Sequence, residues 1–425
     1  MTDMLTLLTQ LLRQPPIIVG IIAFVGLVAQ KADFQKTVLG TLKTTLGFII
    51  LQIGINAIVG SMGPFASIFV KAFGITGVIS NDEAAAGLVI PLVGFEVGAI
   101  MGLSMVVSII AARLSPWKNI YLSGHKQWGI SSVVAFSLHL IGLDSMMIIL
   151  LGSIITGLYL TWYPQILQPF LRQVTGTDDF GIGHAYTLHL TLNAIIAKYI
   201  GNPKDKIDDL KLPAGLEIFR DMAFTTALIF LILYTVVATI AGEAVVSGFT
   251  GGLNMYLWAL MQAFSMAAGL LTLIYGVKML LAEIVPAFVG ISKKLIPGAR
   301  PALDVPVLFP YSPTGTLVGF VVMFITWAVV GMPLAAATTG VIPVPSMTGI
   351  FFGGGTAGVV ANGMGGRRAC ILSGVINGII WPFLVSWFYP FLPMASLAPG
   401  IAWLCYDNMS LALGIVGLGM LLGLY

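Results

Sequence analysis

The chain has 425 residues, of which 58% are hydrophobic and 9% charged, and its mean hydropathy is +0.99. Soluble domains carry about 25% charged residues, so this composition excludes a soluble globular protein and places most of the chain in a lipid bilayer. The net charge of +3 is small and scattered, which excludes a nucleic-acid-binding surface. Cys370 and Cys405 lie in apolar runs and indicate neither a disulfide framework nor a metal site.

The first half of the chain predicts membrane spans separated by basic loops. The expected spans cover residues 16–30, 44–61, 88–112, 131–143 and 146–162. The apolar piece 65–74 is too short to span, so we expect it to be re-entrant or interfacial. Three lysines lie in the loop 31–43, and the positive-inside rule therefore places that loop in the cytoplasm and the N-terminus outside.

The second half follows the same pattern. Spans are expected at residues 222–241, 253–275, 317–330, 347–364, 370–388 and 401–424, with a short piece at 288–295. Gly353, Gly354 and Gly355 are expected to break the span 347–364. The chain thus predicts about eleven crossing or part-crossing elements.

An internal repeat divides the chain. Leu92-Val93-Gly94-Phe95 recurs as Leu317-Val318-Gly319-Phe320, an offset of 317 − 92 = 225, and Gly152 matches Gly374 at 374 − 152 = 222. We therefore predict a first repeat over residues 1–200 with a broken helix at 181–184, and a second over 222–425 with a break near 353–356. The most densely charged segment, 201–221, is expected to be a cytoplasmic amphipathic connector. The predicted fold is an all-α polytopic membrane protein with two inverted repeats that meet at the bilayer midplane, as in secondary transporters.

Four ionisable residues lie beside glycine, proline or a predicted break: Glu83, His125, His184 and Asp304. An ionisable side chain at the bilayer centre costs about 2.5 kcal/mol or more, so it requires a partner or a wet cavity. Ends of broken helices also expose unpaired N–H and C=O groups. We expect these residues, with the backbone of Gly354, Gly355 and Thr356, to form a substrate pocket.

Other ionisable residues favour structural interpretations. Asp144 is expected in a solvated turn, and His139 and His189 on apolar faces where packing is the commoner role of histidine. Glu96 and Glu283 suit a site or a structural ion pair equally well. No metal ligands stand at a recognisable spacing, and a phosphate-binding loop is not indicated, so no cofactor is predicted. A pocket of neutral donors, imidazoles and carboxylates suits a polyhydroxylated solute.

Several motifs, in order along nearly the whole chain, resemble the ascorbate-type enzyme IIC permeases of the bacterial phosphotransferase system. Each motif alone is weak, but together they are specific. They are Gly40-Thr41-Leu42-Lys43-Thr44, Ser123-Gly124-His125, Gly181-Ile182-Gly183-His184, Asp209-Leu210-Lys211-Leu212-Pro213, the run from Gly290 to Ala299, and Asn362-Gly363-Met364-Gly365-Gly366.

The resemblance implies a homodimer in the bacterial inner membrane, in which each protomer has a dimerising scaffold and a mobile, substrate-carrying core. It implies sugar uptake coupled to phosphorylation by a separate cytoplasmic IIB protein, itself phosphorylated by IIA. The family's substrate-binding positions correspond here to Gln52, His125, His184, Asp304 and the 354–356 segment. Asp304 and His184 are the expected catalytic residues. In our hypothesis Asp304 or Glu83 accepts the hydroxyl proton, and His184 either orients the hydroxyl or accepts the proton itself.

Three positions depart from the pattern expected for ascorbate. Glu83 stands where a pocket tyrosine is expected, and Ala185 and Gly129 stand where glutamines are expected. A carboxylate facing an anionic substrate repels it unless protonated. A neutral sugar or polyol carried by the same mechanism therefore remains an alternative.

Two other classes of function remain open from the residues alone. One is an ion-coupled secondary transporter with Asp304 or Asp407 as a proton relay; uptake driven by membrane potential without a IIB protein distinguishes it. The other is a membrane-bound enzyme, against which the missing metal set and nucleophile–base pair argue.

Overall fold

The computed structural model describes residues 15–75, 77–210, 218, 221–294, 296–392, 397 and 400–423. Seven helices in this part of the chain are long and apolar enough to cross a membrane, among them a 39-residue, a 40-residue and a 42-residue helix. The protein is therefore a multi-pass, almost entirely helical membrane protein, as the composition predicts.

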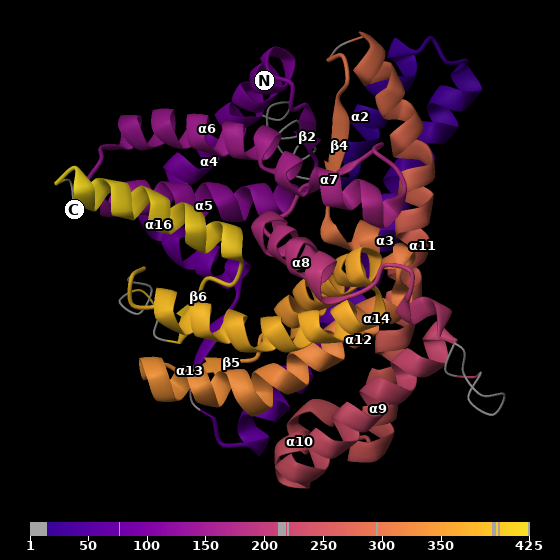
Figure 1. Cartoon of the computed structure of the whole chain (residues 1–425), viewed down its shortest axis with the longest axis vertical. Coiled ribbons are helices and arrows are strands. Elements are labelled where there is room, and N and C mark those ends of the chain that lie inside the picture. Colours follow the sequence, from indigo (N-terminus) through magenta and orange to yellow (C-terminus); the bar gives the residue numbers. More distant parts are fainter. Residues whose placement is uncertain are drawn as a thin grey trace.

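The helices form two groups (Figure 1). In the first group, here called the long-helix bundle, α3 (Phe34–Ala72) and α11 (Met255–Lys294) pack on each other and on α2 (Pro15–Ala29) and α9 (Met222–Ala241). The short helix α10 (Glu243–Thr250) follows α9 at one end of this bundle.

The second group, here called the core, contains the remaining helices. Those from the first half of the chain are α4 (Asp82–Leu114), α5 (Gly124–Leu140), α6 (Ser145–Trp162), α7 (Pro164–Thr175) and α8 (Thr187–Ile200). Those from the second half are α12 (Pro313–Thr326), which continues through a π-helical turn (Trp327–Gly331) into α13 (Met332–Thr339), then α14 (Met347–Phe388) and α16 (Tyr406–Leu421). The two sets interlock, since α8 packs on α14 and α16 packs on α5.

In the described residues, six short strands form two three-stranded parallel sheets. The strands are β1 (Val78–Ser80), β2 (Asn119–Tyr121), β3 (Gly181–Ile182), β4 (Arg300–Leu303), β5 (Pro343–Val344) and β6 (Ile401–Ala402). In one sheet β1 lies between β5 and β6, and in the other β4 lies between β2 and β3. Each half of the chain thus inserts its first strand between the second and third strands of the other half, a reciprocal pairing expected of two copies related by a two-fold axis.

The crossing of α3 and α11 shows the same reciprocity. A Cβ atom on Gly54 would overlap the backbone of Leu273, and a Cβ atom on Gly276 would overlap the backbone of Leu51. The offset is the same for both pairs, since 276 − 54 = 222 and 273 − 51 = 222. Small residues let membrane helices approach closely where no hydrophobic driving force acts between them, so these glycines set the contact of the two longest helices of the bundle.

The prediction of separate short apolar pieces at residues 65–74 and 288–295 is wrong. Residues 65–72 continue α3 through Pro64, and residues 288–294 continue α11 through Pro286. Proline is tolerated inside membrane helices because neighbouring groups satisfy the carbonyl that it leaves unpaired. The two prolines again differ by 286 − 64 = 222, so each long helix carries its proline at the equivalent position.

The predicted break at residues 353–356 is also wrong. These residues are helical, and the glycines instead bring α14 against α12: a Cβ atom on Gly319 would overlap the carbonyl oxygen of Gly354, and one on Gly358 would overlap that of Gly315. The non-helical residue of α14 is Gly366, with φ of 69°, a conformation that glycine adopts without steric cost.

The beginning of the charged connector packs against this break. Asp205 forms an ion pair of 2.8 Å with Arg367, and Asp208 accepts hydrogen bonds from Asn362 (2.7 Å) and Ser312 (2.5 Å). A short 3₁₀ turn, Ile207–Asp209, forms there. The later connector residues 211–217, including Lys211, lie outside the described residues.

Candidate functional site

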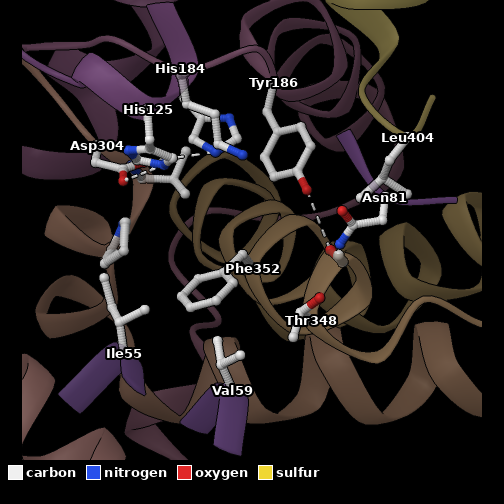
Figure 2. Close-up of a pocket in the computed structure, with 14 residues that line it drawn as sticks. Ile55, Val59, Asn81, His125, His184, Tyr186, Asp304, Thr348, Phe352 and Leu404 are labelled. Atoms are coloured by element: carbon white, nitrogen blue, oxygen red, sulfur yellow. Dashed lines mark hydrogen bonds and ion pairs between the residues drawn. The ribbon is translucent and has the colours of Figure 1, made fainter. Parts of the chain in front are cut away.

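His125, His184 and Asp304, which are widely separated in sequence, meet at one point of the core (Figure 2). His125 Nε2 lies 3.4 Å from Asp304 Oδ2, and His184 Nε2 lies 3.6 Å from Asp304 Oδ1. The side chain of His184 is 3% exposed, that of Asp304 18% and that of His125 48%. A buried imidazole, a half-buried carboxylate and an accessible imidazole therefore share one site.

The β2–β4–β3 sheet explains why these three residues meet. All three strands are parallel, so their carboxyl ends lie at the same edge. His125 follows β2 in the first turn of α5, His184 follows β3 before α8, and Asp304 directly follows β4. Ligand sites in parallel sheets form outside the carboxyl ends of the strands for the same reason.

A cavity of about 340 Å³ opens beside the cluster, lined by residues of both halves of the chain and by α3. Ile55 and Val59 of α3 face the cluster across it. Several other lining residues were not predicted from the sequence. They are Asn81, Lys126, Tyr186, Thr348, Gly349, Phe352 and Leu404.

The repeat offset was the signal that could have identified the second group of lining residues. Adding 222 to Lys126, in the first turn of α5, gives Thr348, in the first turn of α14. Both residues line the cavity. The first turns of two helices therefore meet here, and each carries N–H groups without partners in its own helix.

The other predicted site residues have different positions. Gln52 lines a smaller cavity of about 60 Å³ that also touches His125 and Asp304. The side chain of Glu83 lies outside the described part of the structure. Gly354 and Gly355 contact α12, and Thr356 donates a hydrogen bond to the carbonyl oxygen of Phe352 (2.5 Å). The segment 354–356 is therefore part of a helix contact and is not among the residues that line the large cavity.

Both signs of charge border the cavity, because the Asp304 carboxylate lines it together with Lys126 and the first turns of two helices. Two helix N-termini, each with a partial positive charge, and the Lys126 side chain face the cavity. His125, His184 and Asp304 offer three ligand atoms within 4.8 Å of one another, a spacing that could hold a divalent cation. The helix N-termini and Lys126 disfavour a divalent cation, and they offset the Asp304 carboxylate for a ligand that accepts hydrogen bonds.

An equivalent of Asp304 exists in the other half of the chain, since 304 − 82 = 222. Asp82 is 3% exposed, and its Oδ1 accepts hydrogen bonds from the backbone N–H groups of Leu404 (2.8 Å) and Cys405 (3.2 Å). Its Oδ1 is therefore committed to the turn between β6 and α16, whereas its Oδ2 is buried without a hydrogen-bond partner among the described residues.

The structure also shows the role of most of the other ionisable residues considered in the sequence. Asp144 caps α6 and accepts a hydrogen bond from Met147 N (3.0 Å), and buried His189 bonds Asn377 (2.9 Å), so both structural interpretations are confirmed. Glu283 pairs with Lys43 at 3.4 Å. His139 is exposed at the end of α5, so its interpretation as a packing residue is wrong.

Two reciprocal halves that enclose a cavity with a cluster of ionisable side chains are typical of membrane transporters. The sequence of the chain agrees with this class: residues 10–412 match the family of sugar-specific permease components of the phosphotransferase (PTS) system, and the chain belongs to that family. It is 28% identical over 443 aligned residues to the "Ascorbate-specific PTS system EIIC component" of Mycoplasma pneumoniae. The match covers 89% of this chain, which spans 65% of the length of that relative.

Proposed function

We propose that this protein is a phosphotransferase-system IIC permease that carries ascorbate or a closely related anionic sugar. The observation that supports this most strongly is the cluster of Asp304, His125 and His184 at a cavity between the two halves of a permease-family fold. Imidazoles and a carboxylate hydrogen-bond a vicinal diol, and the helix N-termini with Lys126 balance the charge of an anion. The relative from Mycoplasma pneumoniae is named as specific for ascorbate, which belongs to this class of sugar.

The proposed cycle moves the core against the long-helix bundle. The cluster belongs to the core, whereas Ile55 and Val59 on the opposite wall belong to α3 of the bundle. A sliding core would therefore carry the solute past a fixed apolar wall, as in an elevator mechanism. A homodimer held together by the bundle, set in the bacterial inner membrane with the N-terminus outside, completes the proposal.

Phosphorylation follows on the cytoplasmic side. A solute hydroxyl attacks the phosphorus of a phosphocysteine on the IIB protein, so an O–P bond forms, the S–P bond breaks and the cysteine leaves as a thiolate. Asp304 accepts the hydroxyl proton and His184 orients the hydroxyl. IIA then restores the phosphate on IIB. The extra negative charge on the product weakens its fit beside Asp304 and favours its release.

Calorimetry on purified protein tests this function. Ascorbate and a panel of neutral pentoses, hexoses and polyols are titrated in turn, followed by a phosphoryl-transfer assay with phosphorylated IIB. We expect saturable ascorbate binding and IIB-dependent formation of a sugar phosphate. Uptake that proceeds without IIB and follows the membrane potential would replace the proposal with ion-coupled transport.

A neutral sugar or polyol is the second candidate. Ala185 and Gly129 are both buried. Because alanine and glycine have no polar side chain, neither position can supply the hydrogen bonds of the glutamines expected for ascorbate. Selective binding of a neutral member of the panel, unchanged between mildly acidic and mildly basic pH, would favour this candidate and leave the coupling to IIB in place.

A further inference from the structure

Asp407 is a fully buried carboxylate that belongs to the second half of the chain but binds the first. It lies in the first turn of α16, and its side chain points into the N-terminus of α8. Its Oδ2 accepts a hydrogen bond from Thr187 N (2.9 Å) and its Oδ1 accepts one from Leu188 N (3.0 Å). The Tyr159 hydroxyl donates a third, of 2.8 Å, to Oδ2.

These bonds act on the turn that carries His184. Thr187 and Leu188 begin α8 two residues after Ala185, and their N–H groups have no partner within the helix. Two further hydrogen bonds involve the same turn: Asp407 N donates to Ala185 O (3.4 Å), and the Thr187 side-chain hydroxyl donates to His184 O (3.0 Å). A carboxylate with one oxygen for each N–H group fixes the start of α8 and, through it, the position of the His184 ring.

The two halves of the chain differ at this point. Ala185 is the equivalent of Asp407, since 407 − 185 = 222, so the first half has no counterpart of the Asp407 carboxylate. The carboxylate that it places near α16 is Asp82, which binds Leu404 N and Cys405 N just before that helix. Asp407 is not among the residues that line the cavity, and both of its oxygens are occupied by donors. A direct contact with the solute is therefore not its role.

From these contacts we infer that Asp407 is a positioning residue for the substrate site: it acts across the interface of the two repeats to hold His184 against Asp304. For its effect on substrate binding, this inference rests on the proposed function.

The test is a double-mutant cycle of Asp407→Asn with His184→Ala, read as substrate affinity by calorimetry. An asparagine has one carbonyl oxygen, so its NH₂ group must face either Thr187 N or Leu188 N, and one cap bond is lost. We expect Asp407→Asn to weaken binding about tenfold in the parent protein. In the His184→Ala background, Asp407→Asn should change the affinity less than about twofold, because the imidazole that Asp407 positions is absent.

Asp82→Asn is the matched control. It also removes a buried carboxylate, but its remaining carbonyl oxygen can still accept from both Leu404 N and Cys405 N. We expect it to leave binding within about twofold of the parent. Equal losses for Asp407→Asn with and without His184 would overturn the inference, because additivity means that the two residues act separately.

Hydrogen exchange supplies a readout that needs no substrate. Peptides covering residues 183–190 should exchange faster in Asp407→Asn than in Asp82→Asn, and unchanged exchange there would also overturn the inference. If no sugar binds the parent protein, the proposed function fails while this measurement still decides the role of Asp407. If Asp407→Asn does not fold, Tyr159→Phe removes only the third donor, and we expect a smaller change in the same direction.

Discussion

Asp304 and Asp82 occupy equivalent positions in two halves of one molecule, but their surroundings differ. Asp304 faces a cavity and two imidazoles, whereas Asp82 is bound by the backbone of a turn. The equivalents of His125 and His184 at an offset of 222 are Met347 and Tyr406, which do not supply imidazole groups. The repeated framework thus provides two positions for a carboxylate, and a few side chains decide which of them can hold a solute.

The largest effect that this comparison predicts comes from Asp304→Asn. The variant removes the charge that both histidines approach, and a hydrogen bond to a charged group contributes about 1.5–3 kcal/mol. We expect substrate affinity to fall about 10- to 100-fold, with the unfolding temperature little changed. Calorimetry and thermal unfolding in the same detergent measure both quantities. Unchanged affinity would remove Asp304 from the site.

Equivalent substitutions in α3 and α11 of the long-helix bundle should lower stability equally. At the site, in contrast, substitutions of the equivalent residues Asp304 and Asp82 should have different effects. Gly276→Val and Gly54→Val each place atoms into the backbone of the facing helix, and overpacking of this kind costs typically about 1–3 kcal/mol. We expect both variants to lower the unfolding temperature by similar amounts. Gly60→Val is the control, because a Cβ atom there meets nothing within 4 Å. A large difference between the Gly54 and Gly276 variants would contradict the reciprocal contact.

Asp82→Ala should lower stability and leave substrate affinity nearly unchanged, the reverse of what we expect for Asp304→Asn. It leaves the N–H groups of Leu404 and Cys405 without their acceptor in a buried site, which costs about 1–3 kcal/mol. We expect reduced thermal stability and a change in substrate affinity below about threefold. A loss of affinity as large as that of Asp304→Asn, in folded protein, would show that both carboxylates serve the site.

The smallest effect concerns an ion network that joins the strand before Asp304 to residues of the first half of the chain. Asp178 pairs with Arg300 (2.7 Å) and Arg172 (3.0 Å), and the equivalent of Arg300 is the apolar Val78, since 300 − 78 = 222. Partial burial raises the pKa of Asp178, but its hydrogen bond from Gln168 and the two arginines outweigh this, so the pKa is lowered.

A carboxyl group with a lowered pKa in the folded state stabilises the protein above its unfolded pKa of about 3.9, and this stability is lost as the pH falls through the folded value. The Asp178 side chain is 44% exposed, so solvent screening limits the contribution to about 1 kcal/mol or less. We expect Asp178→Asn to be slightly less stable than the parent at neutral pH. Unfolding curves recorded at decreasing pH should converge, and a constant difference would contradict the assignment.

Much of the fold could be predicted from the sequence because lipid imposes a strong pattern. The hydropathy of the chain and the motif at Leu92 and Leu317 indicated a polytopic protein with a repeat, and the predicted span 222–241 coincides with α9. The breaks were less predictable. Proline and glycine were treated as signals of interruption, but Pro64 lies inside a continuous helix and Gly354 supports close packing between helices. The same residue types serve both purposes, and only the neighbouring helix decides which applies.

The site was partly predictable for a similar reason. His125, His184 and Asp304 stood out because ionisable residues beside glycine or proline are rare in an apolar chain. Their meeting point could not be derived, since it depends on β4 pairing between β2 and β3, and these strands have two to four residues each. Thr348 and Tyr186 carry no such signal individually, because threonine and tyrosine are common in membrane helices.

The most direct test of the account is an experimental structure of the protein with ascorbate bound. We predict that the ligand lies in the cavity beside α3, with its oxygens at hydrogen-bonding distance from Asp304 and His184 and near the first turns of α5 and α14. A ligand bound at Asp82, or in a cavity that does not include Asp304, would contradict the claim that only one of the two equivalent carboxylates holds the solute.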